Sequence, residues 1–330
     1  MYLEDVTIQG FKSFSENTDM SFKSGISVII GNNGVGKSNI LDAIVWVLGE
    51  NSLERIRCYD RRELFFAGSN GHPPAESIRV ELNFKKEESD DTPAFQFARE
   101  MTRDGQSRYL FQNERIDRQA YEEQLKALRM RQTLKTIIRQ EQINDILLVN
   151  PKERFHIIQS FLGLTSAPED KTDFCQSLEE VVAPLFTRYM SYLSPLSEVR
   201  FDLNALNSEN EFDLEITLPG NRVRRAHQLS GGEKAITSLA LKLALFHQLQ
   251  SPLYLLDEVE PALDYINHKS MQAFLKDVAS DKQLIMITHL RSTIDLADTL
   301  HGVRTRFDGS SFMKFYFVMD ERLLKLYKCC

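Results

Sequence analysis

One stretch near the N-terminus, residues 26–39, restricts the fold more than any other part of the chain. Its first five residues, 26–30, are mostly apolar and β-branched, which predicts a buried strand. Gly31 to Ser38 then fits the pattern G-x-x-x-x-G-K-[ST]. Apolar residues recur beyond it at helical spacing, at Ile40, Leu41, Ile44, Val45 and Leu48. A loop of this kind between a strand and a helix is the context in which the pattern binds phosphate.

The residue types in this loop suit a nucleoside triphosphate. Gly31, Gly34 and Gly36 allow backbone angles that turn successive N–H groups toward phosphate oxygens, and the helix adds its positive N-terminal end. Lys37 is expected to reach the β- and γ-phosphates, and the Ser38 hydroxyl to ligate Mg²⁺. A glycine-rich turn that happens to precede Lys-Ser is the alternative. The strand and helix on either side favour nucleotide binding.

Composition narrows the class of protein. The chain has 330 residues, 42% hydrophobic and 26% charged, as expected for a globular protein with a sizeable core. A formal charge of −7 argues against a generally basic nucleic-acid protein, so any contact with DNA needs a local patch. No signal peptide and no run of 18 apolar residues is present, which predicts a cytoplasmic protein without a membrane span. Four cysteines without metal-ligand spacing suggest a reducing compartment: Cys58, Cys175, Cys329 and Cys330.

Hydrophobic patterns predict the other elements. We expect a helix over 117–139, a helix opened by Pro151, and a helix near 175–192. Alternating apolar residues predict strands over 2–9, 77–84, 199–206 and 211–218. Polar and small residues near 165–175 predict a linker between an N-terminal lobe, 1–164, and a C-terminal lobe, 176–330.

The most basic stretch runs from Arg115 to Arg139. A positive face there could contact a DNA backbone, whose attraction does not depend on base sequence. A solvated helix, partly neutralised by Glu122 and Glu123, is the alternative.

Three motifs in the second half complete a candidate site. Leu229 to Lys234, Leu-Ser-Gly-Gly-Glu-Lys, precedes a strongly apolar helix and offers N–H groups and a hydroxyl to an anion. An apolar strand ends in Asp257 and Glu258, which suit orientation of Mg²⁺ and polarisation of an attacking water. A further strand ends at His289, on the edge where open α/β sheets bind ligands. Taken singly, each motif also fits a structural role: a helix cap, an acidic loop, or a structural histidine.

Together these motifs resemble the ATP-binding-cassette (ABC) ATPases and, in more detail, the head domain of structural maintenance of chromosomes (SMC) proteins. The fold implied is α/β, with a mixed β-sheet core carrying the phosphate loop, an antiparallel β subdomain and a helical lobe with the signature motif. The matching residues are Gly10 to Phe14, Gly31 to Asn39 with Ile-Leu-Asp-Ala-Ile after it, Leu53 to Arg57, Phe66 to Ser69, Gln140, Ile143 to Leu147, Pro151 to Arg154, Leu229 to Ala235, Asp257 to Asp264 and Ile287 to His289.

The resemblance implies roles for these positions. Glu258, His289 and Arg57 become the catalytic candidates, and Ser38, Gln140 and Asp257 the Mg²⁺ ligands. Ser230, Gly232 and Asp264 are expected at an interface with a second head. The nucleotide-binding candidates are Lys12, Asn32, Asn33, Gly34, Gly36, Lys37, Ser38, Asn39, Gln140, Asp257, Ser230, Gly231 and Gly232.

The chain departs from the family in one large respect. Family members carry a long coiled coil and a hinge between the two halves, and no sustained heptads are present here. Either the coil has been deleted near 165–175, or this is a naturally coil-less relative. Pro261, and Glu260 in place of the usual aspartate, also differ from the family's D-loop at the interface.

The function implied is an ATP-hydrolysing head that dimerises around two ATP molecules and acts on DNA in chromosome condensation and segregation, which predicts a nucleoid-associated location. ATP and Mg²⁺ are the cofactors, and a winged-helix accessory subunit is expected on the C-terminal lobe. Two alternatives stay open: a RecF- or RecN-like DNA-repair ATPase, and a nucleotide-gated interaction module with negligible turnover. The cassette of a membrane transporter fits less well, because of the long 70–165 insertion.

Overall fold

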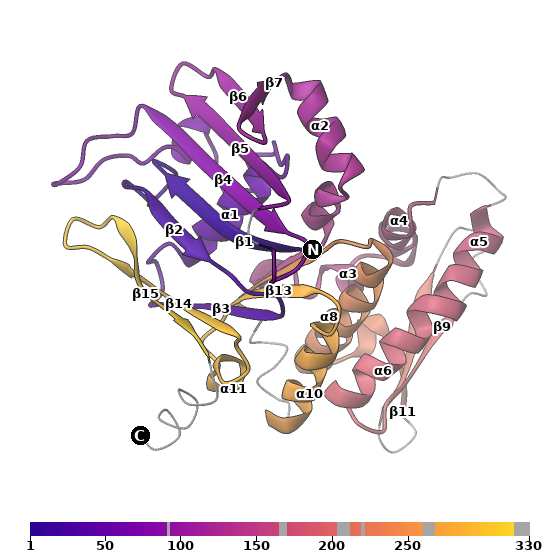
Figure 1. The fold of residues 1–330 in the computed structure, drawn as a ribbon. Coiled ribbons are helices and arrows are strands. Elements are labelled where there is room, and N and C mark those ends of the chain that lie inside the picture. Colours follow the sequence, from indigo (N-terminus) through magenta and orange to yellow (C-terminus); the bar gives the residue numbers. More distant parts are fainter. Residues whose placement is uncertain (91–92, 165–169, 203–211, 219–221, 260–267, 320–330) are drawn as a thin grey trace. The chain divides into compact units, whose positions relative to one another are not determined.

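The structure is a computed structural model that describes residues 1–90, 93–164, 170–202, 212–218, 222–259 and 268–319 (Figure 1). It consists of two compact units. Unit 1 comprises Met1–Ile137, Ser251–Asp257 and Ala279–Cys330, and unit 2 comprises Ile138–Gln250 and Glu258–Val278. The units therefore interleave along the chain, whereas the sequence division into 1–164 and 176–330 treats the two halves as consecutive.

Unit 1 contains an antiparallel sheet in which every neighbouring pair of strands is antiparallel. Along β4, Ile78, Val80, Leu82 and Phe84 are buried and alternate with less buried residues, as the sequence predicts for a sheet with one covered face. The strand order is β2 (Thr18–Ser21), β1 (Tyr2–Gln9), β4 (Ser77–Lys85), β5 (Phe95–Thr102), β6 (Ser107–Phe111) and β7 (Glu114–Ile116).

The second sheet of unit 1 is mixed. Four parallel strands, β14, β3, β13 and β12, are followed at one edge by antiparallel β15. β12 and β13 are buried along their whole length, as expected for parallel strands covered on both faces. A further strand, β8 (Ile137–Arg139), runs across the boundary into unit 2. The five strands in order are β15 (Ser311–Val318), β14 (Thr299–Thr305), β3 (Ile26–Ile30), β13 (Gln283–Ile287) and β12 (Leu253–Asp257).

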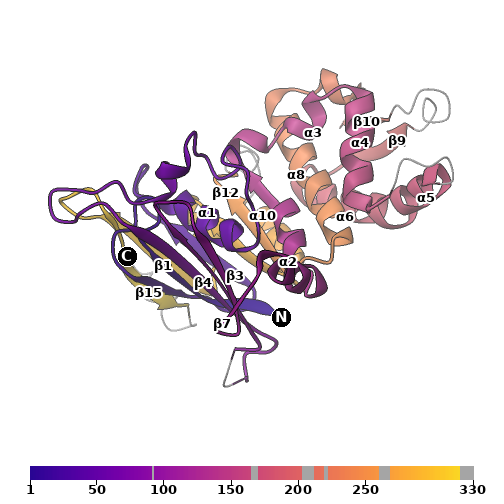
Figure 2. The ribbon, with the colours of Figure 1, turned by 90° about the horizontal axis from the view of Figure 1, so that it is seen from above.

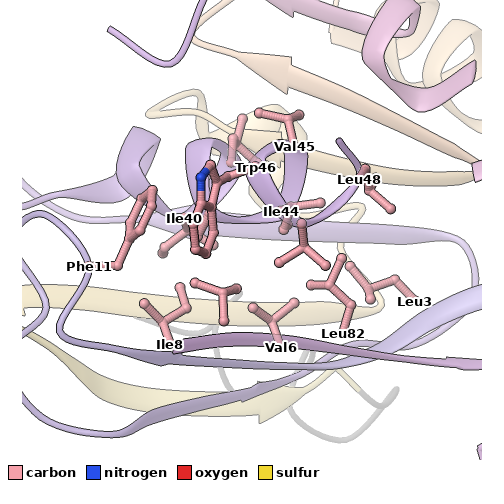
Figure 3. Packing of buried hydrophobic residues seen from close by; sticks show 14 of the residues in the cluster. Leu3, Val6, Ile8, Phe11, Ile40, Ile44, Val45, Trp46, Leu48 and Leu82 are labelled. Carbon is pink, nitrogen blue, oxygen red and sulfur yellow. The ribbon is translucent and has the colours of Figure 1, made fainter. Parts of the chain in front are cut away.

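Helix α1 (Lys37–Val47) lies in the core of unit 1, and nearly all of its residues are buried. Figure 3 shows Ile40, Ile44 and Leu48 facing residues of the antiparallel sheet such as Val6 and Leu82. Burial of a large aliphatic side chain contributes about 1.5–3 kcal/mol. Because α1 begins directly after the phosphate loop, this packing fixes the base of the loop.

The predicted helix over 117–139 is wrong in its extent. Helix α2 (Arg118–Ala127) is followed by Arg129 in a left-handed conformation (φ 57°), by the 3₁₀ turn η2 (Met130–Lys135) and then by extended backbone. Thr136 bonds to β12: its carbonyl oxygen accepts from the Leu255 N–H at 3.0 Å, and its hydroxyl donates to the Leu253 carbonyl at 2.7 Å. These bonds to a strand replace the helix that the composition suggests.

Unit 2 is mainly helical, and Figure 2 shows α4, α6 and α8 lying close together. Helix α4 begins at Pro151, as predicted, with Asn150 as its N-cap and Gly163 as its C-cap. The helices are α3 (Asp145–Leu148), α4 (Pro151–Leu162), α5 (Asp170–Ser177), the π-helical η4 (Leu178–Val182), α6 (Ala183–Leu193), α8 (Gly231–Gln248) and α10 (His268–Val278).

Short elements complete both units. The antiparallel sheet of unit 2 has the order β11-β10-β9, and β10 confirms the alternation predicted over 211–218. Part of the predicted linker is helical, because α5 begins at Asp170; residues 165–169 lie outside the described residues. Within the described ranges, none of the helices combines the length and apolarity needed to cross a membrane. The remaining elements are β9 (Glu198–Asp202), β10 (Asp213–Leu218), β11 (Arg222–Arg225), η3 (Gln140–Gln142) and η5 (Ala226–Gln228) in unit 2, and η1 (Arg61–Leu64) and α11 (Arg291–Ile294) in unit 1.

Candidate functional site

The loop between β3 and α1 has the backbone that its glycines predict. Gly34 and Gly36 have φ angles of 80° and 94°, a left-handed region that is costly for residues with a Cβ. At Gly36 a Cβ would also lie 2.4 Å from the Oγ of Ser13 and 2.5 Å from the Oγ of Ser311. The turn into α1 therefore requires glycine for both backbone and steric reasons.

Two serines that sequence reasoning missed hold this loop in place. The Ser311 hydroxyl donates to the Val35 carbonyl at 2.7 Å, and the Ser311 N–H donates to the Ser13 carbonyl at 2.8 Å. The Asn39 amide donates to the Ser13 hydroxyl at 2.8 Å. Ser13 belongs to the quoted Gly10 to Phe14 motif, but no local pattern marks Ser311, which reaches the loop only through sheet topology.

The side chains of Lys37 and His289 contact each other at the phosphate loop. The Lys37 ammonium donates to the carbonyls of Gly31 at 2.9 Å and Asn32 at 3.1 Å, and it lies 3.2 Å from the Nε2 of His289. His289 follows β13, the strand next to β3, so the parallel sheet delivers it to this edge. The predicted proximity of these two residues is present in the structure.

Ser38 and Asp257 form the pair that fits Mg²⁺. The Ser38 hydroxyl donates to the Oδ1 of Asp257 at 3.0 Å, and Asp257 is 5% exposed. One hydroxyl and one carboxylate oxygen are hard ligands, and Mg²⁺ in nucleotide sites binds through few protein ligands plus phosphates and waters. No cluster of three or more metal-ligating His, Cys, Asp or Glu occurs in the part of the chain that the structure describes. Ser38 and Asp257 could therefore serve as the protein ligands of a nucleotide-bound metal.

A second group of candidates gathers around Asp42, which the sequence analysis did not single out. The Oδ2 of Asp42 lies 2.6 Å from the Lys12 ammonium and 2.7 Å from the Arg57 Nη2, and Arg57 also donates to Asn39 at 3.4 Å. Burial lowers the pKa of Arg57, but the adjacent Asp42 carboxylate outweighs it, so that this pKa is raised overall. The sequence feature that could have identified Asp42 is an acidic residue among the apolar residues that follow the phosphate loop.

These side chains border a cavity of about 630 Å³ in unit 1. Lys12, Asn39 and Arg57 line it together with Phe65 and Arg103. The guanidinium of Arg103 lies over the Phe65 ring, 5.5 Å from its centroid. The lining of this cavity thus combines cations with an aromatic ring, groups that could bind a nucleotide.

The Ser-Gly-Gly motif forms the start of α8 in unit 2. The Ser230 hydroxyl accepts from the Glu233 N–H at 3.4 Å, and the Glu233 carboxylate accepts from the Ser230 N–H at 2.7 Å, a capping box. That bond from the Ser230 N–H lowers the pKa of Glu233, although partial burial opposes it. Ser230 and Gly231 are exposed, so the N-terminus of an 18-residue helix faces outward.

The other candidates of unit 2 stand in irregular backbone. Glu258, directly after β12, has a left-handed φ of 50°, a conformation that is uncommon for a non-glycine residue and is concentrated at functional sites. Gln140 opens η3 and is exposed. The D-loop, with Glu260, Pro261 and Asp264, lies outside the described residues.

The basic stretch does not form one helical face. Arg115 lies in β7, and Arg118 in α2 forms an ion pair of 2.9 Å with Glu122. Arg131, in η2, contacts the same Glu122 at 3.3 Å. Contact with DNA at this stretch stays a prediction.

Comparisons with known proteins agree with this geometry. The family described as "RecF/RecN/SMC N terminal domain" matches residues 2–311. The chain is 30% identical over 221 residues to the chromosome partition protein Smc of Halobacteriovorax marinus, covering 64% of this chain and 18% of that protein. The Smc protein of Mycobacterium tuberculosis is 30% identical over 190 residues, or 56% of this chain and 16% of that protein. The chain thus spans less than a fifth of the length of these relatives.

Solved head domains share the fold along nearly the whole chain. An Smc head bound to the C-terminal winged-helix domain of ScpA has a TM-score of 0.84 at 28% identity, covering 98% of this chain and 100% of that one. The SMC head domain of Thermotoga maritima has a TM-score of 0.66 at 31% identity, covering 97% of this chain and 100% of that one. The mixed sheet, antiparallel sheet and helical unit described above are therefore those of an SMC head.

Proposed function

This chain belongs to the RecF/RecN/SMC N-terminal-domain family, and we propose that it is an SMC head that binds and hydrolyses Mg²⁺-bound ATP in work on chromosomal DNA. One observation carries the proposal: Ser38 and Asp257 on one side, and Lys37 and His289 on the other, converge on the same phosphate loop from distant parts of the chain. A phosphate chain seated in that loop would meet a cation, two potential metal ligands and a histidine.

Each of these groups has a definable task. Lys37 neutralises phosphate charge, and the loop N–H groups and the start of α1 donate to phosphate oxygens. Ser38 and Asp257, with Gln140, would hold Mg²⁺, which supplies charge stabilisation to the transferring phosphoryl group. Glu258 would accept a proton from the attacking water, and His289 and Arg57 would stabilise charge on the γ-phosphate.

The complete site needs two copies. Ser230, Gly231 and Gly232 present an exposed helix N-terminus, which favours an anion but has no phosphate loop of its own. We propose that these residues bind the γ-phosphate of ATP held by a second copy, with Asp264 at the same interface. Because ATP then bridges two helix N-termini, its binding favours the dimer and its hydrolysis favours dissociation.

Partners follow from the relatives. The solved Smc head bound to the winged-helix domain of ScpA makes a winged-helix protein the proposed accessory subunit, and the chromosome partition proteins make DNA the proposed target and the nucleoid the proposed location. The resemblance to Smc proteins favours this assignment over a RecF- or RecN-like repair ATPase. The segment 165–175 is the proposed place of a coiled coil in longer family members.

A phosphate-release assay tests the function. The purified chain is incubated with ATP and Mg²⁺, with and without duplex DNA, beside Lys37→Ala. We expect turnover that needs Mg²⁺ and that Lys37→Ala abolishes. Retention of ATP without any phosphate release, at all Mg²⁺ and DNA concentrations, would instead identify a nucleotide-gated interaction module.

A further inference from the structure

A buried carboxylate, Asp42, connects two of the cations that line the candidate nucleotide cavity, Lys12 and Arg57. It lies on the second turn of α1 and its side chain is fully buried. Its Oδ2 receives the Lys12 ammonium at 2.6 Å and the Arg57 guanidinium twice, from Nη2 at 2.7 Å and from Nε at 3.2 Å. Lys12 is 30 positions away in the chain and Arg57 is 15, so this contact exists only in the folded state.

The two cations share that oxygen although like charges repel. The Lys12 side chain is only 9% exposed, so water screens its charge poorly, whereas the Arg57 side chain is 39% exposed at the rim. With the carboxylate, the three side chains carry a net charge of +1. Without it, the two partly buried cations would carry a net charge of +2 where little water can solvate them. The charge of Asp42, and not only its shape, is therefore needed to keep both side chains together.

The backbone at both cations also needs support. Lys12 has a φ of 50° and Arg57 a φ of 56°, left-handed conformations that are unfavourable for residues with long side chains. Lys12 donates to the carbonyl of Ile56, next to Arg57, and its own N–H donates to the carbonyl of Leu64 at 2.8 Å. Asp42 thus anchors a connected unit of two segments, not two separate side chains.

We propose that Asp42 is the positioning residue of the nucleotide cavity: its buried charge holds Lys12 and Arg57 side by side on the cavity wall, where both cations act on the phosphates. This inference rests on the proposed function, since it assigns the arrangement a task in ATP turnover. Asp42 itself acts through Arg57 and Lys12 and does not touch the substrate.

A double-mutant cycle tests the proposal in the 330-residue chain. Asp42→Asn keeps the shape of the side chain and removes its charge. Because misplacement of a catalytic group by about 1 Å can reduce turnover about 100-fold, we expect a fall in kcat of about 10- to 100-fold in Asp42→Asn. Adding Arg57→Ala to Asp42→Asn should then cost less than about twofold more, because the guanidinium is already misplaced.

The matched control is Glu81→Gln in unit 1, which removes the carboxylate from another partly buried ion pair, 2.7 Å from Arg79, while Arg79 keeps Glu100 as a second partner. The effect of Arg57→Ala should be as large in Glu81→Gln as in the wild type. If Arg57→Ala costs as much in Asp42→Asn as it does in the wild type, or if Asp42→Asn turns over at the wild-type rate, the positioning role is wrong. Wild-type chain without turnover would refute the proposed function instead.

A measurement without nucleotide distinguishes failure of the positioning role of Asp42 from failure of the proposed ATPase function. In ¹⁵N-arginine NMR spectra, the Nε–H signal of Arg57, assigned by its loss in Arg57→Lys, should be protected from solvent exchange in the wild type and exchange faster in Asp42→Asn. The Nε–H signal of Arg154 should stay the same in both. Equal exchange of the Arg57 signal in the two proteins would overturn the proposal even if no ATP is hydrolysed.

Discussion

The hydroxyl oxygen of Ser38 lies 3.0 Å from the Oδ1 of Asp257, although 219 positions separate the two residues in the chain. Ser38 is the second residue of α1 and Asp257 is the last residue of β12, and both elements belong to unit 1. Two oxygen atoms that could ligate a metal ion are thereby brought together beside the phosphate loop. The sheet order explains this, because β3 and β12 flank β13 and all three strands are parallel.

We predict that Asp257→Asn raises the Mg²⁺ concentration needed for half-maximal ATP turnover. Mutation of residues that hydrogen-bond to metal ligands typically lowers metal affinity or activity by about 10- to 100-fold. Loss of a carboxylate that binds the metal directly should therefore raise the required Mg²⁺ concentration by at least about tenfold. Titration of MgCl₂ at fixed ATP measures it. Asp277→Asn, which removes the partner of Arg188 in unit 2, is the control and should leave the titration unchanged. An unchanged titration in Asp257→Asn would remove Asp257 from the metal site.

Two glycines of the phosphate loop provide a matched pair for stability. Both have left-handed φ angles, so alanine at either should cost about 1–2 kcal/mol in backbone conformation. A Cβ at Gly34 meets nothing within 4 Å, whereas one at Gly36 meets two serine hydroxyls. We expect Gly36→Ala to lower the thermal midpoint of the nucleotide-free chain more than Gly34→Ala does. Equal midpoints would show that the loop relaxes around the added methyl group.

Arg154 is predicted to be essential for the stability of unit 2. It is 2% exposed, forms the 2.6 Å ion pair with Asp213 and donates to the carbonyls of Ile146, Leu147 and Val149 at 3.0–3.2 Å. Removal of one partner of a buried pair typically costs about 3–5 kcal/mol. Arg154→Met should therefore lower the free energy of unfolding by about that amount in urea titrations followed by circular dichroism. Arg154→Lys should restore little of the lost stability, because the lysine ammonium lacks the planar guanidinium with its several N–H donors. A decrease in the free energy of unfolding of less than about 1 kcal/mol, the contribution typical of a surface ion pair, would contradict this role.

His301 predicts sensitivity to acid. It is fully buried between the rings of Phe22 and Tyr316, and neither ring nitrogen has a hydrogen-bond partner among the residues that the structure describes. Burial lowers its pKa from 6.5 to about 3. The unfolded chain therefore binds a proton first as the pH falls, and stability should decline between pH 6.5 and about 3.

The decline amounts to about 2 kcal/mol at pH 5, since one pH unit corresponds to about 1.4 kcal/mol. His301→Phe should remove this part of the pH dependence between pH 7 and pH 5 in urea titrations. Exposed His227, changed to Gln, is the control and should retain it. If His301→Phe loses stability with acid as steeply as the wild type, the buried imidazole is not the cause.

The sequence predicts those features of the fold and the site that are formed by residues close together in the chain. The apolar run of β3, the glycines and Lys37 predict a phosphate loop, and Pro151 predicts the start of α4. The apolar strands that end at Asp257 and before His289 predict that these residues reach one sheet edge, and the structure places both beside the loop. Such features need only the neighbouring residues to be recognised.

Other features depend on partners far away in the chain. Asp42 is one acid in an apolar helix until folding brings Lys12 and Arg57 to it, and Ser311 reaches the phosphate loop only because β15 lies beside β14. The predicted helix over 117–139 is wrong for the same reason, because the bonds of Thr136 to β12 are tertiary. Composition and periodicity carry no information about those contacts.

In the proposed mechanism, one copy holds an incomplete reaction site and ATP joins two copies. Glu258→Gln should bind ATP without cleaving it, because it keeps the size of the side chain and removes the base. Size-exclusion chromatography with light scattering should then show a dimer with Mg²⁺ and ATP and a monomer without nucleotide. Adding Ser230→Arg to Glu258→Gln should restore the monomer, since it blocks the start of α8. A Glu258→Gln chain that binds ATP and remains a monomer at all protein concentrations would contradict the ATP-bridged dimer.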